Sequence, residues 1–211
     1  MVAGFAGSLI SFRSALIAAL QARGLEVHVA APGLTQGGAV REQLEAWGVA
    51  VHEIPLQRTG QNPLADLRSM TAPWLRAGER IMWALWQLML RVRPHYVLGY
   101  TIKPVIYGSL AAWLARVPRR FAMVEGLGFF FTSGDRPLSL QRRILKSLIT
   151  GLYRVGLAAA HRVIFLNPDD RDEFVATGLL PLQKTFLLGG IGVDLDRWPM
   201  MQPVTDTVMF L

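Results

Sequence analysis

Cysteine is absent from the 211 residues of the sequence. A disulfide framework is therefore excluded, which is compatible with a protein of the cytoplasm. Histidine is scarce, because the chain has only 4, and none of them has the spacing of a metal-binding cluster. His28 and His52 alternate with strand-forming residues, whereas His95 and His161 fall at the ends of expected elements. These positions favour structural histidines, and the sequence predicts no metal site.

Long uncharged stretches are missing as well, although 52% of the residues are hydrophobic. A helix that spans a membrane needs about 18 apolar residues in succession. The longest apolar stretches here are interrupted by Arg91, Lys146, Arg154 and Arg162. The first residues, Met1-Val2-Ala3-Gly4, lack the basic and apolar regions of a secretory signal. We therefore expect a chain with an ample core, without a spanning helix and without a secretory signal.

Acidic residues are few, since 15 Asp and Glu stand against 22 Lys and Arg and the net charge is +7. A basic and apolar chain suits an anionic membrane surface or a phosphate-bearing ligand, with nucleic acid as a third option. The excess is greatest between Arg116 and Arg154, where Glu125 and Asp135 are the only acids. The apolar residues interleaved with these cations are Phe129, Phe130, Phe131, Leu138, Leu140, Ile144 and Leu145. Such a segment can rest on an anionic membrane. The alternative is an amphipathic helix whose apolar face belongs to the core.

Short apolar strands alternate with amphipathic helical segments along most of the chain. Strands are expected at residues 2–3, 26–31, 49–54, 96–98, 119–124, 162–166 and 185–188. Helices are expected at 8–24, 39–47, 73–91, 104–114, 139–160 and 168–178, with a further helix start at Asn62-Pro63. In the first helix, Ser8 or Ser11 is the expected cap, and the expected apolar face consists of Leu9, Phe12, Leu16 and Leu20. The alternation predicts an α/β fold, with a Rossmann-like parallel sheet and helices on both of its faces.

Residues 1–198 are expected to form one domain. Its first strand is shorter than the roughly five residues that a buried strand takes, so we expect this strand to be clipped. Residues 199–203 begin and end with proline and resemble a linker, and the run from Thr207 to Leu211 has the composition of a strand. We therefore expect residues 199–211 to be the linker and the first strand of a second domain that is missing.

The stretch from Tyr100 to Gly108 is the turn around which the rest of the chain is arranged. It follows an apolar strand, and Pro104 suits the first turn of a helix because its missing N–H costs nothing there. Thr101 and Lys103 therefore lie at the carboxyl end of a strand, the edge at which open α/β sheets bind ligands. Lys103, beside the exposed N–H groups of a helix, suits an anion such as phosphate. The alternative is a solvated loop lysine.

A first glycine-rich turn runs from Gly4 to Ser8 at the same edge. Glycine lets the backbone approach a ligand closely, so this turn can cradle a phosphate or a sugar, and the alternative is a plain tight turn. Arg13 can point back at this edge and bind a diphosphate, or it is a surface arginine. The turn lacks the G-x-G-x-x-G spacing, and Ala31-Pro32 stand where a ribose-binding acid belongs. A nicotinamide oxidoreductase is therefore disfavoured.

A second glycine-rich turn, from Glu125 to Gly128, follows the strand expected at 119–124. Glu125 lies between this buried strand and Gly126. A carboxylate in that position can bind the hydroxyls of a ligand or take a proton from an attacking hydroxyl. The alternative is an ordinary turn carboxylate.

The order of these turns resembles the amino-terminal half of a family-four glycosyltransferase, most closely the bacterial branch that extends polyprenyl-diphosphate-linked sugars. The resemblance covers nearly the whole chain and is carried by residues 7–13, 100–104 with 107–108, 126–129, 167–170 and 192–194. It implies one half of a GT-B fold and a metal-independent, retaining transfer from a nucleotide sugar. The sequence departs from the family in two ways. The domain that holds the nucleotide is absent, and Glu125 stands where many relatives have a histidine.

The resemblance also implies roles for the residues singled out above. Glu125 is the expected catalytic residue, and the expected acceptor-binding residues are Gly7, Ser8, Arg13, Thr101, Lys103, Gly126 and Gly128. Gly192 and Asp194 are expected at the hinge between the two domains.

The implied function is a hexosyl- or N-acetylhexosaminyltransferase of bacterial surface polysaccharide biosynthesis, cytoplasmic and peripheral at the inner face of the cell membrane. Its acceptor is expected to be a lipid-linked saccharide and its donor a UDP-linked sugar, with no further cofactor and no nucleic acid partner. Because the donor domain is absent, the 211-residue chain alone is expected to be inactive. Two alternatives stay open. One is a sugar-nucleotide epimerase of the same architecture, and the other is a non-catalytic membrane-associated domain.

Overall fold

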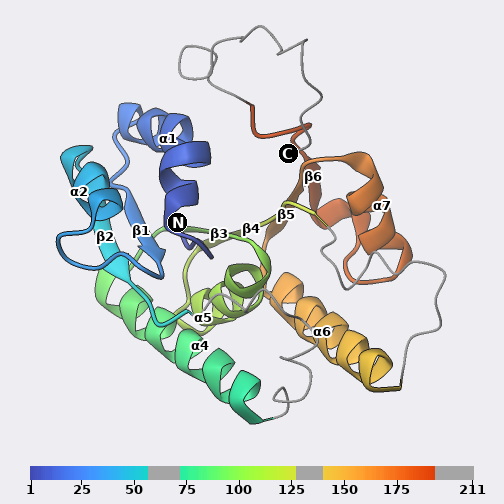
Figure 1. The fold of residues 1–211 in the computed structure, drawn as a ribbon. Coiled ribbons are helices and arrows are strands. Elements are labelled where there is room, and N and C mark those ends of the chain that lie inside the picture. The colour runs from blue at the N-terminus through green and yellow to red at the C-terminus, as the bar shows by residue number, and fades with distance from the viewer. Residues whose placement is uncertain (57–71, 127–139, 193–211) are drawn as a thin grey trace, which may run out of the picture.

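The structure is a computed structural model that describes residues 1–56, 72–126 and 140–192 (Figure 1). Several features expected from the sequence fall outside these ranges. They are the helix start at Asn62-Pro63, the phenylalanines at 129–131, Gly128, Asp194 and the strand at 207–211.

A parallel sheet forms the centre of the fold. On one side, β1 (His28–Ala31) pairs with β2 (Ala50–Glu53). On the other side four strands pair in chain order: β3 (Tyr96–Tyr100), β4 (Arg119–Val124), β5 (Arg162–Phe165) and β6 (Thr185–Leu187). Val2 joins the two groups, because it bridges Ala30 of β1 and Gly99 of β3. The order across the sheet is therefore β2, β1, the segment at Val2, β3, β4, β5 and β6.

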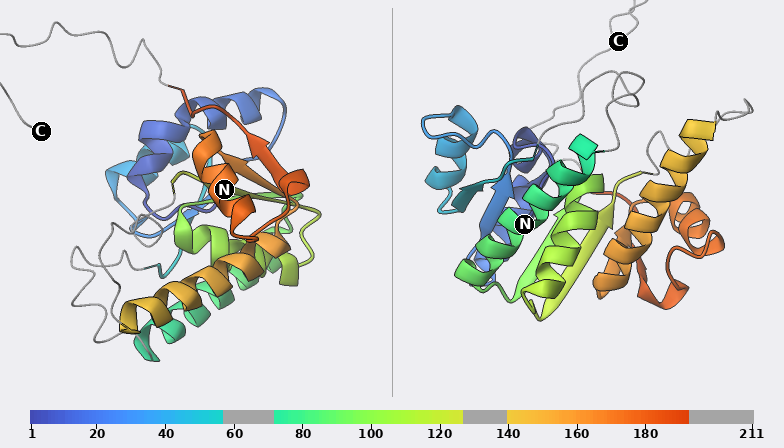
Figure 2. Two further views of the ribbon diagram at one scale, coloured as in Figure 1. Left: turned by 90° about the vertical axis from the view of Figure 1, so that its right-hand side faces the viewer. Right: turned by 90° about the horizontal axis from the view of Figure 1, so that it is seen from below.

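Helices cover both faces of this sheet, as the sequence predicts (Figure 2). One face carries α1 (Gly7–Ala22) and α2 (Ala39–Ala46). The other face carries α4 (Ala72–Val92), α5 (Ser109–Leu114) and α6 (Leu140–Ala159). The short helices α7 (Pro168–Ala176) and η2 (Leu182–Lys184) lie between β5 and β6 in the chain. Among the described residues, no helix is long and apolar enough to cross a membrane.

Two apolar cores result, one on each face of the sheet. The core under α1 and α2 contains Leu9, Ile17, Leu44 and Tyr100. The core under α4, α5 and α6 contains Leu85, Ile106, Leu157 and Phe165. Phe174 of α7 belongs to the second core, where its ring meets the rings of Tyr153 and Phe165 edge to face. Side chains that alternate along each strand thus have a partner layer on either side.

The start of α7 follows from its sequence. The side-chain oxygen of Asn167 accepts a hydrogen bond from the backbone N–H of Asp170 at 2.8 Å, and Pro168 occupies the first helical turn. Asparagine is a preferred N-cap because it satisfies a donor that has no partner inside the helix.

The expectations for α1 were wrong in two respects. The helix begins at Gly7 with Ala6 at its N-cap and has no side-chain cap, so neither Ser8 nor Ser11 caps it. Phe12, expected on the apolar face, is 60% exposed. The buried residues of the helix are Leu9, Ile10, Arg13 and Ile17. Leu9 is buried and Leu20 packs against the core, as predicted, but Arg13 rather than Phe12 lies in the buried stripe, which hydrophobic periodicity does not indicate.

The segment after β3 is wound more loosely than expected. Residues Pro104–Gly108 form one π-helical turn, η1, before α5 begins, and Pro104 occupies its first turn as predicted. Two glycines allow this turn to pack tightly. A Cβ added at Gly99 would lie 2.8 Å from the carbonyl oxygen of Pro104, and one added at Gly156 of α6 would lie 2.8 Å from the Cα of Ile106.

We predict that Gly156→Ala destabilises the protein and that Gly151→Ala on the same helix stabilises it. The new methyl group at position 156 meets backbone, which cannot yield without moving α6, and such overpacking costs about 1–3 kcal/mol. The added Cβ at position 151 meets nothing within 4 Å. Alanine there should raise the free energy of unfolding by about 0.5–1 kcal/mol, because it favours helix more than glycine does. Denaturant unfolding of both variants tests this, and equal stability of the two would contradict the close packing of α6 on η1.

Candidate functional site

The site lies where the direction of the crossover connections reverses. From the segment at Val2 the chain runs into α1 on one face of the sheet, and from the adjacent β3 it runs through η1 into α5 on the other face. Open α/β sheets bind ligands beyond the carboxyl ends of the strands at such a switch point. The turns at Gly4–Ser8, at Thr101 and at Glu125 all lie at this edge, as the sequence predicts.

The first two turns are in direct contact. A Cβ added at Gly4 would lie 2.3 Å from the hydroxyl oxygen of Thr101, so only glycine fits there beside the threonine. Thr101 has a φ of 68°, which is rare for a β-branched residue. Its carbonyl oxygen accepts a hydrogen bond from the N–H of Val105 at 3.0 Å, which ties the turn to η1. The backbone at this edge is thus held in an unusual shape, which is common at binding sites.

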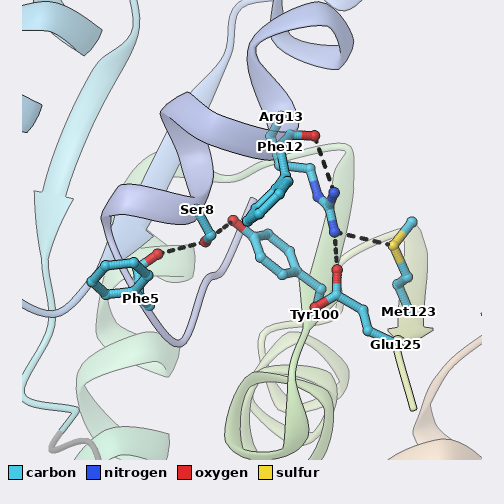
Figure 3. A network of polar contacts seen from close by, with 7 residues as sticks. All are labelled: Phe5, Ser8, Phe12, Arg13, Tyr100, Met123 and Glu125. Carbon is cyan, nitrogen blue, oxygen red and sulfur yellow. Dashed lines mark hydrogen bonds and ion pairs between the residues drawn. The ribbon is translucent and has the colours of Figure 1, made fainter. Parts of the chain in front are cut away.

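Arg13 is the centre of a polar network between α1 and the sheet (Figure 3). One terminal nitrogen donates to the carbonyl of Phe12 at 3.1 Å. The other forms an ion pair with the Oε1 of Glu125 and reaches the sulfur of Met123 at 3.5 Å. The guanidinium group lies over the ring of Tyr100, 4.5 Å from its centroid. Arg13 and Glu125, predicted as separate site residues, are therefore partners, and the alternative of a surface arginine is wrong.

The two partners differ in exposure. The side chain of Arg13 is 3% exposed and that of Glu125 is 29% exposed. The carboxylate therefore lies at the surface of the site with the guanidinium group beneath it. The Nε of Arg13 is buried and has no hydrogen-bond partner within the described part of the chain.

Tyr100 is a site residue that the sequence reasoning missed. Its side chain is fully buried, and its hydroxyl lies 3.0 Å from the Oγ of Ser8. Burial raises the pKa of Tyr100 to about 12, although the hydrogen bond between Tyr100 and Ser8 and the charge of Arg13 act in the opposite direction. The phenol therefore stays protonated at neutral pH. One feature of the sequence could have indicated this role, because Tyr100 is the last residue of a buried strand and directly precedes the predicted turn.

The structure also describes four other predicted site residues, namely Gly7, Lys103, Gly126 and Gly192. Gly7 is the first residue of α1, and Gly126 follows Glu125 in an exposed position. Lys103 has helical backbone angles, with φ −66° and ψ −47°, so it belongs to the first helical turn rather than to a loop. Gly192 is exposed with a φ of 72°, whereas Gly128 and Asp194 lie outside the described residues.

Two of the histidines, His28 on β1 and His52 on β2, form a pair away from this network. Their rings stack with centroids 5.3 Å apart, and the Nδ1 of His28 lies 3.0 Å from the Nε2 of His52. Burial, and then the neighbouring His28, lower the pKa of His52. Within residues 1–56, 72–126 and 140–192, no group of three or more His, Asp or Glu could hold a metal ion.

Comparison with known proteins identifies related sequences over most of the chain. The model of the glycosyl transferase 4-like domain matches residues 12–188, which is well over half of the chain. A curated relative from Campylobacter jejuni subsp. jejuni serotype O:2 is 27% identical over 191 residues. It is an N,N'-diacetylbacillosaminyl-diphospho-undecaprenol alpha-1,3-N-acetylgalactosaminyltransferase. The match covers 90% of this chain and 45% of the relative, so the chain spans less than half the length of that protein.

Solved structures share the fold at low sequence identity. MurG of Acinetobacter baumannii has a TM-score of 0.52 at 16% identity, over 89% of this chain and 44% of that one. The UDP-GlcNAc 2-epimerase of Neisseria meningitidis has a TM-score of 0.53 at 15% identity, over 88% and 44%. The S. aureus MnaA–UDP complex has a TM-score of 0.57 at 15% identity, over 97% and 48%. These likenesses confirm the expected fold class, a Rossmann-like half of a GT-B architecture.

We predict that the protein loses stability as the pH rises from 10 to 12, because of the raised pKa of Tyr100. An unfolded tyrosine loses its proton near pH 10, whereas the folded Tyr100 keeps it to about pH 12. The native state therefore binds more protons in this range, so the free energy of unfolding falls by up to about 3 kcal/mol. Urea unfolding at pH 9 and near pH 11 measures the fall. Tyr100→Phe should make the fall smaller, and an equal fall in the variant would contradict the burial of a neutral phenol at this position.

Proposed function

Because the chain belongs to the family of glycosyl transferase 4-like domains, we propose that it is the acceptor-binding half of a retaining glycosyltransferase. The reaction is the transfer of a sugar from a nucleotide sugar to a lipid-linked saccharide in bacterial surface polysaccharide biosynthesis. The family match supports the class of reaction. The name of the Campylobacter relative, a transferase that acts on an undecaprenyl-diphosphate-linked sugar, supports the class of acceptor and an N-acetylhexosaminyl donor.

The observation that carries this proposal is the carboxylate of Glu125 at the switch point. It is partly exposed, it is paired with Arg13, and it follows the carboxyl end of β4. The acceptor hydroxyl attacks the anomeric carbon on the face that the nucleoside diphosphate leaves, as retention requires, so that a C–O bond forms while the bond to the nucleoside diphosphate breaks. Glu125 takes the proton that the hydroxyl releases, the role of a general base.

The neighbouring groups at this edge bind the rest of the acceptor. Lys103 is the phosphate ligand, because an ammonium group beside the N–H groups of a helical turn attracts a diphosphate. Thr101 and Ser8 contact acceptor hydroxyls, and the turn at Gly7 and the turn at Gly126 and Gly128 let the saccharide approach the backbone closely. We do not include Arg13 among the proposed phosphate ligands, because its side chain is buried and paired with Glu125.

The donor, a UDP-linked sugar, binds to a second domain that follows residues 199–211, with the hinge at Gly192 and Asp194. The length of the Campylobacter relative, of which this chain spans 45%, supports a second half of similar size. Catalysis needs both substrates held together. The 211-residue chain alone is therefore inactive as a transferase.

Binding by the 211-residue chain tests the proposal against its two alternatives. The chain should bind an undecaprenyl-diphosphate-linked saccharide presented in detergent micelles, and it should not measurably bind UDP-N-acetylgalactosamine. Calorimetry with both ligands gives the answer. Binding of the UDP-sugar alone would favour the epimerase, and binding of neither ligand would favour the non-catalytic domain.

Lys103→Ala should weaken binding of the diphosphate-linked saccharide by about ten- to a hundredfold, because a charge-assisted hydrogen bond contributes roughly 1.5–3 kcal/mol. The matched control is Arg23→Ala, which removes an exposed cation at the far end of α1. Lys103→Arg should restore only part of the affinity, since a planar fork does not replace a compact ammonium. Equal affinity of the Lys103→Ala and Arg23→Ala variants would exclude Lys103 from the phosphate site.

We also propose that the protein works in the cytoplasm, at the inner face of the membrane, and that the outer side of α4, α5 and α6 faces the lipid. The segment 116–154 as a whole does not form this surface, because Arg120 turns inward and donates to the carbonyls of Ala159 and Val117. Exposed apolar side chains lie instead on all three helices: Trp83, Leu90, Trp113, Leu114, Leu148 and Val155. The exposed arginines of this layer are Arg80, Arg91, Arg93, Arg116 and Arg154, and Glu79 is the one acid in the three helices. Tryptophan and arginine together suit the interface of an anionic bilayer.

The double variant Trp83→Gln/Trp113→Gln should sediment less with phosphatidylglycerol vesicles than the unchanged chain does. Salt should release the unchanged chain, because the attraction of arginine to anionic lipid is screened. Leu182→Gln is the control, since Leu182 is 52% exposed, much as Trp83 is 57% exposed, and lies outside the three helices. Equal sedimentation with phosphatidylcholine vesicles, or no loss in the double variant, would contradict this surface.

A further inference from the structure

We infer that Arg13 and Tyr100 are positioning residues that hold the carboxylate of Glu125 for proton transfer, and that Arg13 acts through Glu125 rather than on the acceptor phosphate. This inference rests on the proposed function, because it assumes that Glu125 is the base.

Burial and the contacts of its terminal nitrogens keep Arg13 away from a ligand at the surface of the site. Its side chain is 3% exposed, and its two terminal nitrogens are occupied by the carbonyl of Phe12, the sulfur of Met123 and Glu125. The ring of Tyr100 covers one side of the guanidinium plane at 4.5 Å. A diphosphate at the sheet edge therefore meets Glu125 before it meets Arg13.

The ion pair fixes one half of the carboxylate and leaves the other half available. Oε1 of Glu125 is bound by Arg13, and no partner of Oε2 is found among the described residues. A glutamate that is free to rotate loses rotamer entropy when a reaction requires one orientation. With Oε1 already held, Oε2 can meet the acceptor hydroxyl without that loss, which is the advantage of a preorganised site.

Tyr100 holds the guanidinium group in place from below. The hydroxyl of Ser8 donates its one proton to the carbonyl of Phe5 at 2.6 Å, so the hydroxyl of Tyr100 must be the donor in its 3.0 Å contact with Ser8. The ring is therefore fixed at both ends, by the β3 backbone and by this hydrogen bond. A fixed ring under a cation limits the tilt of Arg13, and through Arg13 the place of Oε1.

The network is not built for stability. The buried Nε of Arg13 has no hydrogen-bond partner in the described part of the chain, which is unfavourable for a donor in the interior. An apolar residue of the same length would fill the space without that penalty, and the carboxylate of Glu125 that it leaves unpaired is 29% exposed and can be hydrated. A buried charged group that lowers the stability of the fold is expected at a functional site.

The test measures kcat and KM for the lipid-linked acceptor in a transferase that contains this chain together with its nucleotide-sugar-binding domain. Arg13→Met should lower kcat about 100-fold and change KM by less than about threefold, because a displaced base slows the chemical step more than it weakens binding. The melting temperature of the 211-residue Arg13→Met chain should stay unchanged or rise. Arg13→Lys, which keeps the charge but not the planar fork, should give an intermediate kcat.

Tyr100 is tested by removal of its ring. Tyr100→Leu should lower kcat more than Tyr100→Phe does, since phenylalanine keeps the ring under the guanidinium group. Tyr96→Leu, at the exposed amino end of the same strand, is the control and should leave the kinetics unchanged.

The double variant Arg13→Met/Glu125→Gln separates the inference from the proposed function. If Arg13 acts through Glu125, the double variant should be no slower than Glu125→Gln alone. A further loss of kcat in the double variant, or a pure increase of KM in Arg13→Met, would overturn the inference while Glu125 remained the base. Full activity of Glu125→Gln would instead overturn the proposed function.

Discussion

The ion pair between Arg13 and Glu125 is the interaction on which the rest of the site depends. It joins α1 to the end of β4 across 112 positions of the sequence, and it crosses the switch point of the sheet. Without a guanidinium group beneath it, the carboxylate at the end of β4 would be an ordinary turn residue. The pair gives this carboxylate a defined position.

The fold supplies what the pair needs. The parallel order brings the ends of the Val2 segment, β3 and β4 to one edge, at the point where the crossover connections change from one face of the sheet to the other. Gly4 lets its turn come against Thr101, and Gly99 with Gly156 lets η1 lie close to β3 and α6. Tyr100, the last residue of β3, adjoins these contacts, and its ring lies 4.5 Å from the guanidinium carbon of Arg13.

The sequence predicted the strands and their parallel direction well, because buried parallel strands are apolar runs that glycine and proline separate. Since parallel strands end at the same edge of a sheet, it followed that Gly7, Thr101 and Glu125 would lie at one edge. The sequence did not predict the partner of Arg13. The helical spacing between Leu9 and Arg13 is compatible with a buried position for Arg13 and with an exposed one. Tyr100 was missed because a tyrosine at the end of a buried strand is usually a core residue. Only the structure shows that the guanidinium group of Arg13 lies over its ring. The roles of Lys103 and Gly126 depend on a bound ligand and stay predictions.

One measurement tests the central claim most directly: a crystal structure of the chain with a diphosphate-linked saccharide bound. The account predicts a saccharide hydroxyl within about 2.6–3.2 Å of the free oxygen of Glu125, with the Arg13–Glu125 pair intact. It also predicts the diphosphate beside Lys103. A structure in which Arg13 leaves Glu125 to bind the diphosphate, or in which the saccharide lies away from the switch point, would contradict it.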